Sequence, residues 1–320
     1  MRTWRKLGVM TLMIGVLVAH ACQSRLHAAQ WRQVSDALGR SVSLPAQPQR
    51  IVALGELDLD CLLALGLQPV ATTAGRGQLG VAHYLQAQRL PDGQPVSSLP
   101  LVGLFSQPSL DKLIQVRPDL ILTSSVLDPR LLAQLEQVAP TLFIAKPDEP
   151  WKTVFARLAT WLDREAAAQA FLSEYQARAH ALQARWSARP DRQISIVRWD
   201  PKGPGFMQAD SFASLVARDL GLGRPASQQV PGVKHSPPLS LEALSSLDAD
   251  WLFMGVLDPK GQQAQTLAQL ASQPLFARLK AVQAGHLRLI DGSMWTSQGG
   301  PLAALGVQQD LADALDGVSP

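Results

Sequence analysis

Cysteine is nearly absent from the sequence, which has only Cys22 and Cys61 in 320 residues. Cys61 lies in the apolar run CLLALGL and has no stable partner for an intramolecular disulfide, so we expect a buried and unreactive thiol. No Cys-x-x-Cys pair is present, which excludes the usual redox and zinc motifs.

Motifs of the common catalytic sites are absent as well. The sequence has no Gly-rich phosphate loop, no Gly-x-Ser-x-Gly elbow and no His-Glu-x-x-His pair. Beyond the N-terminal region, the histidines have no partner at metal-ligand spacing: His83, His180, His235 and His286. We therefore predict no catalytic residue and no metal ligand supplied by the protein.

The apparent excess of basic residues comes from the N-terminus. Arg2, Arg5 and Lys6 precede an apolar run from Leu7 to Ala19, which predicts a signal peptide over residues 1–29, too short for a permanent membrane span. Four of the 29 basic residues lie in this segment, so 25 remain against 26 acids. The mature chain therefore gives no reason to expect a nucleic-acid partner.

Cys22 has two interpretations. It follows Ala19-His20-Ala21, an Ala-x-Ala pattern that suits ordinary signal cleavage, or it carries the lipid of a lipoprotein. Ala19 and His20 replace the residues usually found before a lipid-bearing cysteine. We expect a periplasmic location after cleavage, with lipid anchoring through Cys22 as the alternative.

One pattern occurs twice, about one domain length apart. SLDKLIQVRPDLIL at residues 109–122 and SLEALSSLDADWLF at residues 240–253 share Ser-Leu-acid, a later Leu, an Asp and an apolar run. Each copy predicts a helix that leads into a buried strand. The acids at the third position are Asp111 and Glu242. The repetition predicts two lobes of equivalent fold.

Strands alternate with helices around both copies, which predicts the α/β class with mainly parallel central sheets. We predict an N-terminal lobe over residues 30–150 and a C-terminal lobe over residues 190–320. The predicted strands are 50–54, 69–72, 119–123, 141–145, 194–199, 251–253 and 286–291, and the predicted helices include 129–138, 211–220, 264–270 and 301–315.

The lobes are joined by residues 151–189, in which apolar residues keep helical spacing. With Asp163 as its cap, a connecting helix from Arg164 to Trp186 would be roughly 35 Å long. Pro190 ends it. A connection this regular predicts a stiff link between the lobes.

Three stretches carry a family resemblance: PQRIVALGELDLDCLLALGLQPVA, VGLFSQPSLDKLIQVRPDLILTSS and LASQPLFARLKAVQAGHLRLIDGSMWTSQGGPLAAL. They resemble the periplasmic iron-siderophore binding proteins of ABC importers, of the ferric-citrate and ferrichrome type. The likeness covers nearly the whole mature chain.

The resemblance implies the class III periplasmic binding protein fold, with two α/β lobes joined by one long rigid helix. It also implies a monomer that has no cofactor of its own. Such a protein captures a pre-formed iron(III)-siderophore chelate in the cleft and delivers it to an inner-membrane permease dimer with its ATPase. A receptor for cobalamin or haem is an alternative, and a secreted α/β enzyme with an unrecognised site is an alternative of another class.

A ferric siderophore is a bulky, often anionic chelate, so its receptor needs aromatic faces and basic donors. The resemblance places Trp295 of SMWTSQGGP at the ligand, with packing between the lobes as the alternative. Glu56 either lines the cleft or caps the following helix, and Arg198 is expected to point to solvent or to a carboxylate. The other candidates are Arg76 and Tyr84 in a long Gly- and Pro-rich segment, Phe105, Trp199, Lys202 and Phe206.

The turn Gly103-Leu104-Phe105-Ser106 departs from the family, because its relatives carry a basic or small polar residue there that reaches the ligand. This difference puts a simple hydroxamate siderophore in doubt. In the family, an acid near the start of a helix in each lobe docks onto permease arginines, and Asp111 and Glu242 match those positions. The alternative is a local role, in which these acids stabilise helices capped by Ser109 and Ser240.

Overall fold

The computed structural model describes residues 31–125, 128–147, 149–200, 203–257 and 274–317. The predicted signal peptide, the predicted helix at residues 264–270 and Lys202 lie outside these ranges. Within them, no helix is both long enough and apolar enough to cross a membrane.

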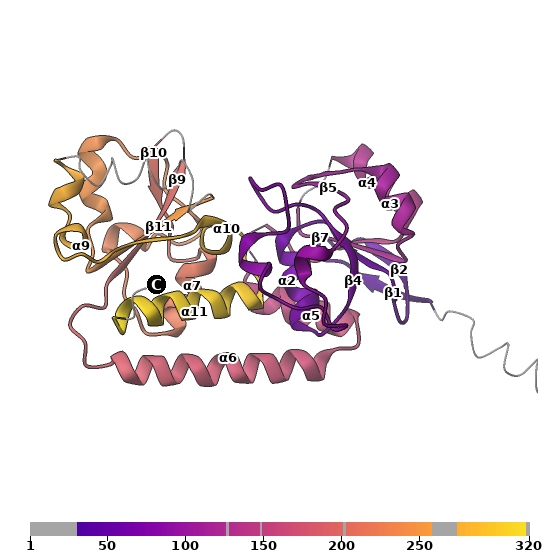
Figure 1. Ribbon diagram of the computed structural model, residues 1–320, viewed down its shortest axis with the longest axis horizontal. Coiled ribbons are helices and arrows are strands. Elements are labelled where there is room, and N and C mark those ends of the chain that lie inside the picture. The colour runs from indigo at the N-terminus through magenta and orange to yellow at the C-terminus, as the bar shows by residue number, and fades with distance from the viewer. Residues whose placement is uncertain (1–30, 126–127, 148, 201–202, 258–273, 318–320) are drawn as a thin grey trace, which may run out of the picture.

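Two α/β lobes lie side by side along the longest axis of the molecule (Figure 1). The sheet of the first lobe has the order β4-β3-β7-β8 and is parallel throughout. Helices cover both of its faces, α2 and α5 on one and α3 and α4 on the other. Because both faces are buried, its strands are continuous apolar runs, as predicted. The elements are β3 (Ile51–Ala53), α2 (Glu56–Ala64), β4 (Pro69–Thr72), α3 (Leu110–Val116), β7 (Leu120–Thr123), α4 (Pro129–Val138), β8 (Thr141–Phe143) and α5 (Trp151–Trp161).

The sheet of the second lobe has the order β10-β9-β11-β12. Strands β9, β11 and β12 are parallel, whereas β10 forms an antiparallel hairpin with β9. The prediction of two equivalent folds is therefore wrong at this edge, where the first lobe has the parallel strand β4. The sequence of β10 is GPGF. Its two Gly and one Pro are typical of a turn, so the sequence does not indicate a strand here. The elements are β9 (Ile194–Asp200), β10 (Gly203–Phe206), α7 (Phe212–Asp219), β11 (Trp251–Val256), β12 (Leu287–Asp291) and α11 (Pro301–Leu315).

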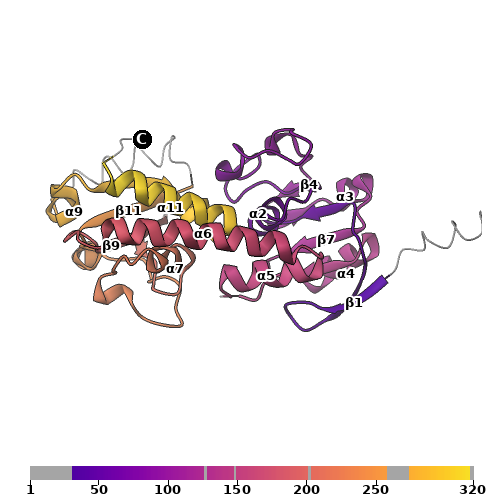
Figure 2. The ribbon, with the colours of Figure 1, turned by 90° about the horizontal axis from the view of Figure 1, so that it is seen from below.

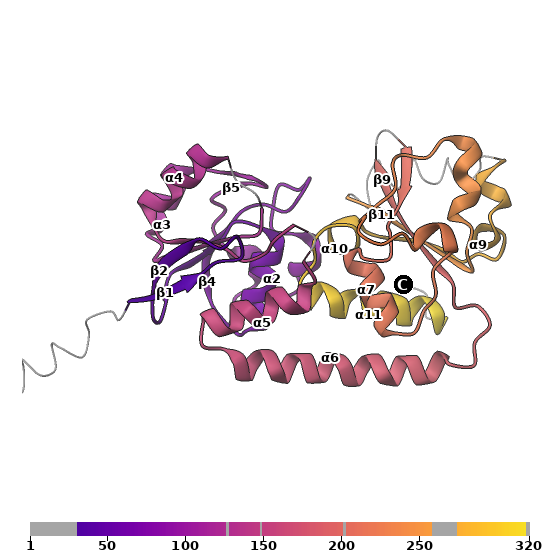
Figure 3. The same cartoon turned by 180° about the vertical axis from the view of Figure 1, so that it is seen from behind.

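The two copies of the repeated pattern occupy matching places but differ in helix type. The first forms α3, whereas the second forms η4 (Leu241–Leu247), a 3-10 helix. Ser109 and Ser240 stand at the N-cap positions, yet neither side chain makes a capping hydrogen bond, so their predicted capping role is wrong. Figures 1 and 3 show α3 and the orange turns of η4 on the same side of the molecule, away from α6.

Helix α6 (Glu165–Trp186) runs along both lobes, as Figure 2 shows from below, which confirms the connecting helix. Its N-cap is Arg164, because Asp163 has a left-handed φ of 53° and does not cap the helix. Helix α11 lies beside α6, and Gln308 of α11 donates to the backbone oxygen of Tyr175 at 3.4 Å. Two helices therefore support the junction of the lobes.

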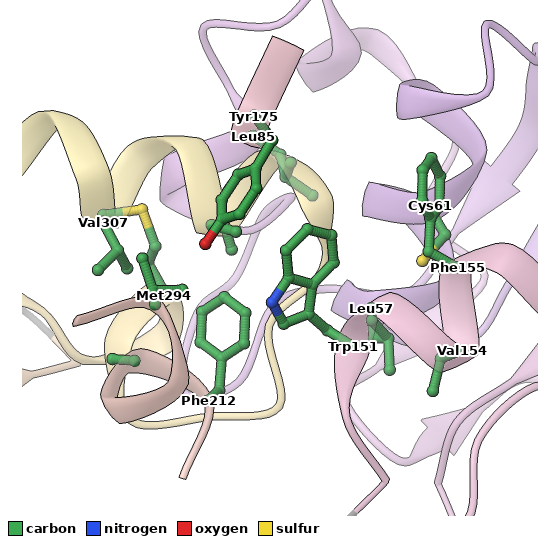
Figure 4. Packing of buried hydrophobic residues seen from close by; sticks show 14 of the residues in the cluster. Leu57, Cys61, Leu85, Trp151, Val154, Phe155, Tyr175, Phe212, Met294 and Val307 are labelled. Atoms are coloured by element: carbon green, nitrogen blue, oxygen red, sulfur yellow. The ribbon is translucent and has the colours of Figure 1, made fainter. Parts of the chain in front are cut away.

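One hydrophobic core continues across this junction. Trp151 of α5, Tyr175 of α6 and Phe212 of α7 meet there (Figure 4), and the rings of Trp151 and Tyr175 are 5.1 Å apart. Smaller elements complete the fold: β1 (Trp31–Ser35), β2 (Ser41–Pro45), η1 (His83–Leu85), η2 (Val96–Ser98), β5 (Gly103–Leu104), β6 (Gln107–Pro108), η3 (Ala226–Gln228), η5 (Phe276–Arg278), α9 (Lys280–Gln283) and α10 (Gly292–Trp295).

Candidate ligand site between the lobes

A cavity of about 320 Å³ lies between the two lobes. Its walls come from loops that follow the carboxyl ends of strands, where ligands of open α/β sheets usually bind. Arg76 follows β4, Arg198 lies near the end of β9, and the loop 296–299 follows β12 and α10. The other lining residues are Pro147, Glu149 and Trp151 from the first lobe and Met207, Asp210, Ser211, Phe212, Leu215, Lys234 and His235 from the second.

The cavity wall carries more positive than negative charge. Arg76, Arg198 and Lys234 contribute cationic groups. Of the two acids, Glu149 is already held by the guanidinium of Arg157, which donates two hydrogen bonds of 2.6 Å to its carboxylate. This pairing lowers the pKa of Glu149 below its ordinary value, and the positive charge of Arg157 balances the negative charge of the carboxylate.

Asp210, the second acid, accepts hydrogen bonds from the loop that contains Gly232 and Lys234. Its carboxylate accepts a hydrogen bond of 2.9 Å from the backbone N–H of Gly232, and its backbone oxygen accepts one of 2.5 Å from Lys234 Nζ. Asp210 therefore holds the Lys234 loop at the cavity. The net positive character of the wall favours an anionic ligand.

Several hydrogen-bonding groups of the wall have no partner within the described part of the chain. They are Arg76 Nε, Ser297 Oγ and Gln298 Nε2, all buried. Buried polar groups are rarely left unpaired in folded proteins, so a site with three of them is suited to a ligand rich in acceptor oxygens.

Arg76 is placed by two neighbours. Its guanidinium lies 4.7 Å from the centre of the Phe105 ring, and its backbone N–H donates to Glu56 at 2.7 Å. Burial raises the pKa of Glu56 to about 7, and the charge of Asp291 across the junction contributes to the rise. Glu56 is the first residue of α2 and makes no capping bond. The predicted capping role is therefore wrong; Glu56 is not among the residues that line this cavity, and its contact is to the backbone of Arg76.

Trp295 does not line the cavity, which corrects the sequence prediction. Its side chain is fully buried, its indole N–H donates to Asp310 Oδ2 at 2.8 Å, and its ring stacks on Phe253 at 5.0 Å. The short helix α10 turns Trp295 into the core of the second lobe. The residues after it, Thr296 to Gly299, reach the cavity instead.

The remaining candidates divide between cavity and core. Arg76 lines the cavity. Phe105 does not line it, but its ring packs against the guanidinium of Arg76. Three aromatic candidates pack into hydrophobic clusters and do not line the cavity, namely Tyr84, Trp199 and Phe206. Lys202 lies outside the described residues.

Sequence reasoning missed most of the cavity wall. Arg198 was expected elsewhere, although its place near the carboxyl end of a central strand is a signal that could have identified it. Lys234, His235 and Gln298 lie in loops without any local pattern, so only the fold brings them together.

Asp111 and Glu242 lie outside the cavity, on the exposed surface of α3 and η4. A hydrogen bond with Ser240 lowers the pKa of Glu242. The structure therefore leaves both acids exposed, on two elements, α3 and η4, that lie on the same side of the molecule (Figure 1).

Residues 51–294 match the family model described as periplasmic binding protein. The chain belongs to this periplasmic binding protein family. It is 26% identical over 313 residues to the probable siderophore-binding lipoprotein YfiY of Bacillus subtilis, covering 93% of this chain and 94% of that protein. It is 28% identical over 275 residues to the achromobactin-binding periplasmic protein of Dickeya dadantii, covering 83% and 86%.

Solved structures agree in fold. The crystal structure of Staphylococcus aureus SirA with staphyloferrin B aligns with a TM-score of 0.74 and 23% identity, over 89% of this chain and 98% of that one. The predicted class III fold and family resemblance are thus confirmed. Periplasmic binding proteins are substrate-binding transport proteins, and both interpretations of Cys22 have counterparts among the relatives, which include periplasmic proteins and lipoproteins.

Proposed function

We propose that this periplasmic binding protein captures a ferric siderophore in the cavity between its lobes and delivers it to an ABC importer. The observation that carries the proposal is the cavity wall, in which Arg76, Arg198 and Lys234 accompany polar groups of Ser297 and Gln298 that have no partner among the described residues. The volume of about 320 Å³ lies within the range of small-molecule sites.

The chemistry of the wall suits the outer surface of an iron chelate. In such a complex the siderophore already fills the coordination sphere of the iron, and its free carboxylate or carbonyl oxygens face outward. Guanidinium groups recognise carboxylates through charge-assisted, often bidentate hydrogen bonds. In this proposal the chelate is cargo, the protein needs no cofactor, and no residue has a catalytic role.

The partner in the proposal is an inner-membrane permease dimer with its ATPase. Asp111 and Glu242 support it, because both are exposed and one lies on each lobe. Two similar acids on two similar lobes suit a partner with two-fold symmetry. The binding protein itself acts as a monomer in this scheme, from the periplasm or anchored through Cys22.

A fluorescence titration of the signal-free protein tests the proposal. Trp151 borders the cavity and should report occupancy, whereas Trp295 is buried in the second lobe. We expect saturable quenching by an anionic ferric chelate such as ferric citrate, with binding confirmed by calorimetry. Folded protein that binds none of a panel of ferric chelates, or that binds haem or cobalamin more tightly, would overturn it.

A further inference from the structure

Arg224 lies buried behind the cavity without a carboxylate partner among the described residues. Only 8% of the residue is exposed. Its guanidinium donates to three neutral acceptors: Ser214 Oγ at 3.0 Å, the backbone oxygen of Met207 at 2.6 Å and Gln228 Oε1 at 2.7 Å. The Nε–H group has no partner there. Burial lowers the pKa of Arg224 to about 9, so the side chain stays charged at neutral pH.

A buried charge without a counter-ion is costly, because neutral hydrogen-bond acceptors replace only part of the lost hydration. A neutral side chain could donate hydrogen bonds to these three neutral acceptors equally well. The positive charge of Arg224 therefore needs an explanation beyond holding Gln228 and the backbone in place.

The contacts of Arg224 lead to the cavity along two routes. Met207, whose backbone oxygen it binds, belongs to the wall. Ser214 Oγ, which accepts from Arg224, lies 2.8 Å from Ser211 Oγ, and Ser211 belongs to the wall too. In the structure Ser211 Oγ donates to Ser214 Oγ. Because hydroxyl hydrogens rotate, this bond can reverse when a ligand binds, so that Ser214 donates to Ser211 and Ser211 donates into the cavity.

We propose that Arg224 is a positioning residue for which the bound chelate supplies the missing negative charge. In this arrangement Arg224 polarises Ser214, Ser214 polarises Ser211, and the Ser211 hydroxyl donates to an anionic oxygen of the ligand. Ser211 is also the N-cap residue of α7, so the positive end of the helix dipole adds to the same place. The inference rests on the proposed function and narrows the cargo to chelates with a net negative charge.

Calorimetric titration with two ferric chelates, anionic ferric citrate and neutral ferrichrome, tests this role. We expect Arg224→Gln to weaken binding of the anionic chelate by about tenfold and binding of the neutral one by less than about twofold. Arg89→Gln, which removes the same charge from an exposed position, should leave both affinities unchanged. Equal losses for both chelates would show that Arg224 has only a structural role.

A double-mutant cycle checks the route and does not depend on Arg224→Gln being stable. Ser214→Ala interrupts the path while keeping Arg224, and should lower the affinity for ferric citrate in the same direction. The path predicts that Ser211→Ala costs less affinity in the Ser214→Ala background than in the wild type, because an unpolarised Ser211 is a weaker donor, whereas equal losses in the two backgrounds would contradict it. Wild-type protein that binds neither chelate would overturn the proposed function instead; unchanged selectivity in variants of a protein that does bind would overturn only this inference.

Discussion

Asp60 of the first lobe accepts a hydrogen bond of 2.7 Å from the backbone N–H of Leu302, the second residue of α11. Its other carboxylate oxygen accepts one of 2.9 Å from the N–H of Ala303. The start of α11 is thus capped by a side chain that lies 242 residues earlier in the chain. Pro301 needs no such partner because it has no N–H. This contact ties the two lobes together at the junction.

Asp60→Ala should lower the free energy of unfolding by about 1–2 kcal/mol, because two buried N–H groups lose their acceptor. Asp60→Asn keeps one acceptor oxygen and should cost less. Equilibrium unfolding in urea, followed by circular dichroism, measures both. Equal stabilities of wild type and Asp60→Ala would contradict the capping role.

Asp58 gives a prediction for pH. Burial raises its pKa from 3.8 to about 7, so between these values the native state binds a proton that the unfolded chain has lost. The contribution of Asp58 to the free energy of unfolding is therefore largest below pH 4 and declines as the pH rises towards 7. Asp58→Asn should flatten the slope between pH 5 and pH 7 by at most about 1.4 kcal/mol per pH unit. Identical slopes in urea titrations of the two proteins would refute this.

Substitutions at Trp295 and Arg76 should have different effects: the first should lower stability, and the second should lower ligand affinity. Trp295→Phe leaves the Asp310 carboxylate without its 2.8 Å donor and should cost about 1–3 kcal/mol of stability, with ligand affinity nearly unchanged. Arg76→Gln removes a charge from the cavity wall and should weaken binding of an anionic ferric chelate at least about tenfold. Thermal unfolding and calorimetry together check both. If Trp295→Phe lowered ligand affinity and left stability unchanged, Trp295 would belong to the binding site after all.

Charge reversal at Asp111 and Glu242 should separate binding from transport. The double variant Asp111→Lys/Glu242→Lys should lose ATP-driven import in reconstituted vesicles while keeping its affinity for the chelate. Glu165→Lys/Glu174→Lys makes the same charge change on α6, on the opposite side, and should transport normally. Transport by the first variant at the wild-type rate would disprove the docking role.

The sequence predicted the fold best where both faces of an element are buried. Strand β7 has four consecutive buried residues, and the repeated acid, Leu and Asp marked the elements around it. Strand β10 was missed because its Gly and Pro residues give no strand pattern. Helix α6 was recognised by the spacing of buried residues such as Tyr175 and Trp186.

The site was harder to predict because its residues share no local pattern. Trp295 sits in a polar stretch that suggested exposure, yet the turn of α10 directs it to Asp310. The environment of Arg224 depends on Ser214 and Met207, which only the folded chain brings together. Spacing along the chain reveals burial, but it does not reveal which charges lack a partner.

The cap on α11 also bears on the order of folding. During synthesis Asp60 is made long before Leu302, so a growing chain can form the first sheet but cannot give this buried carboxylate its donors. A first lobe produced alone would keep Asp60 of α2 as a buried acceptor without donors, and part of the shared core would stay uncovered. We therefore expect the molecule to fold and unfold as one cooperative unit, completed only when its last helix docks.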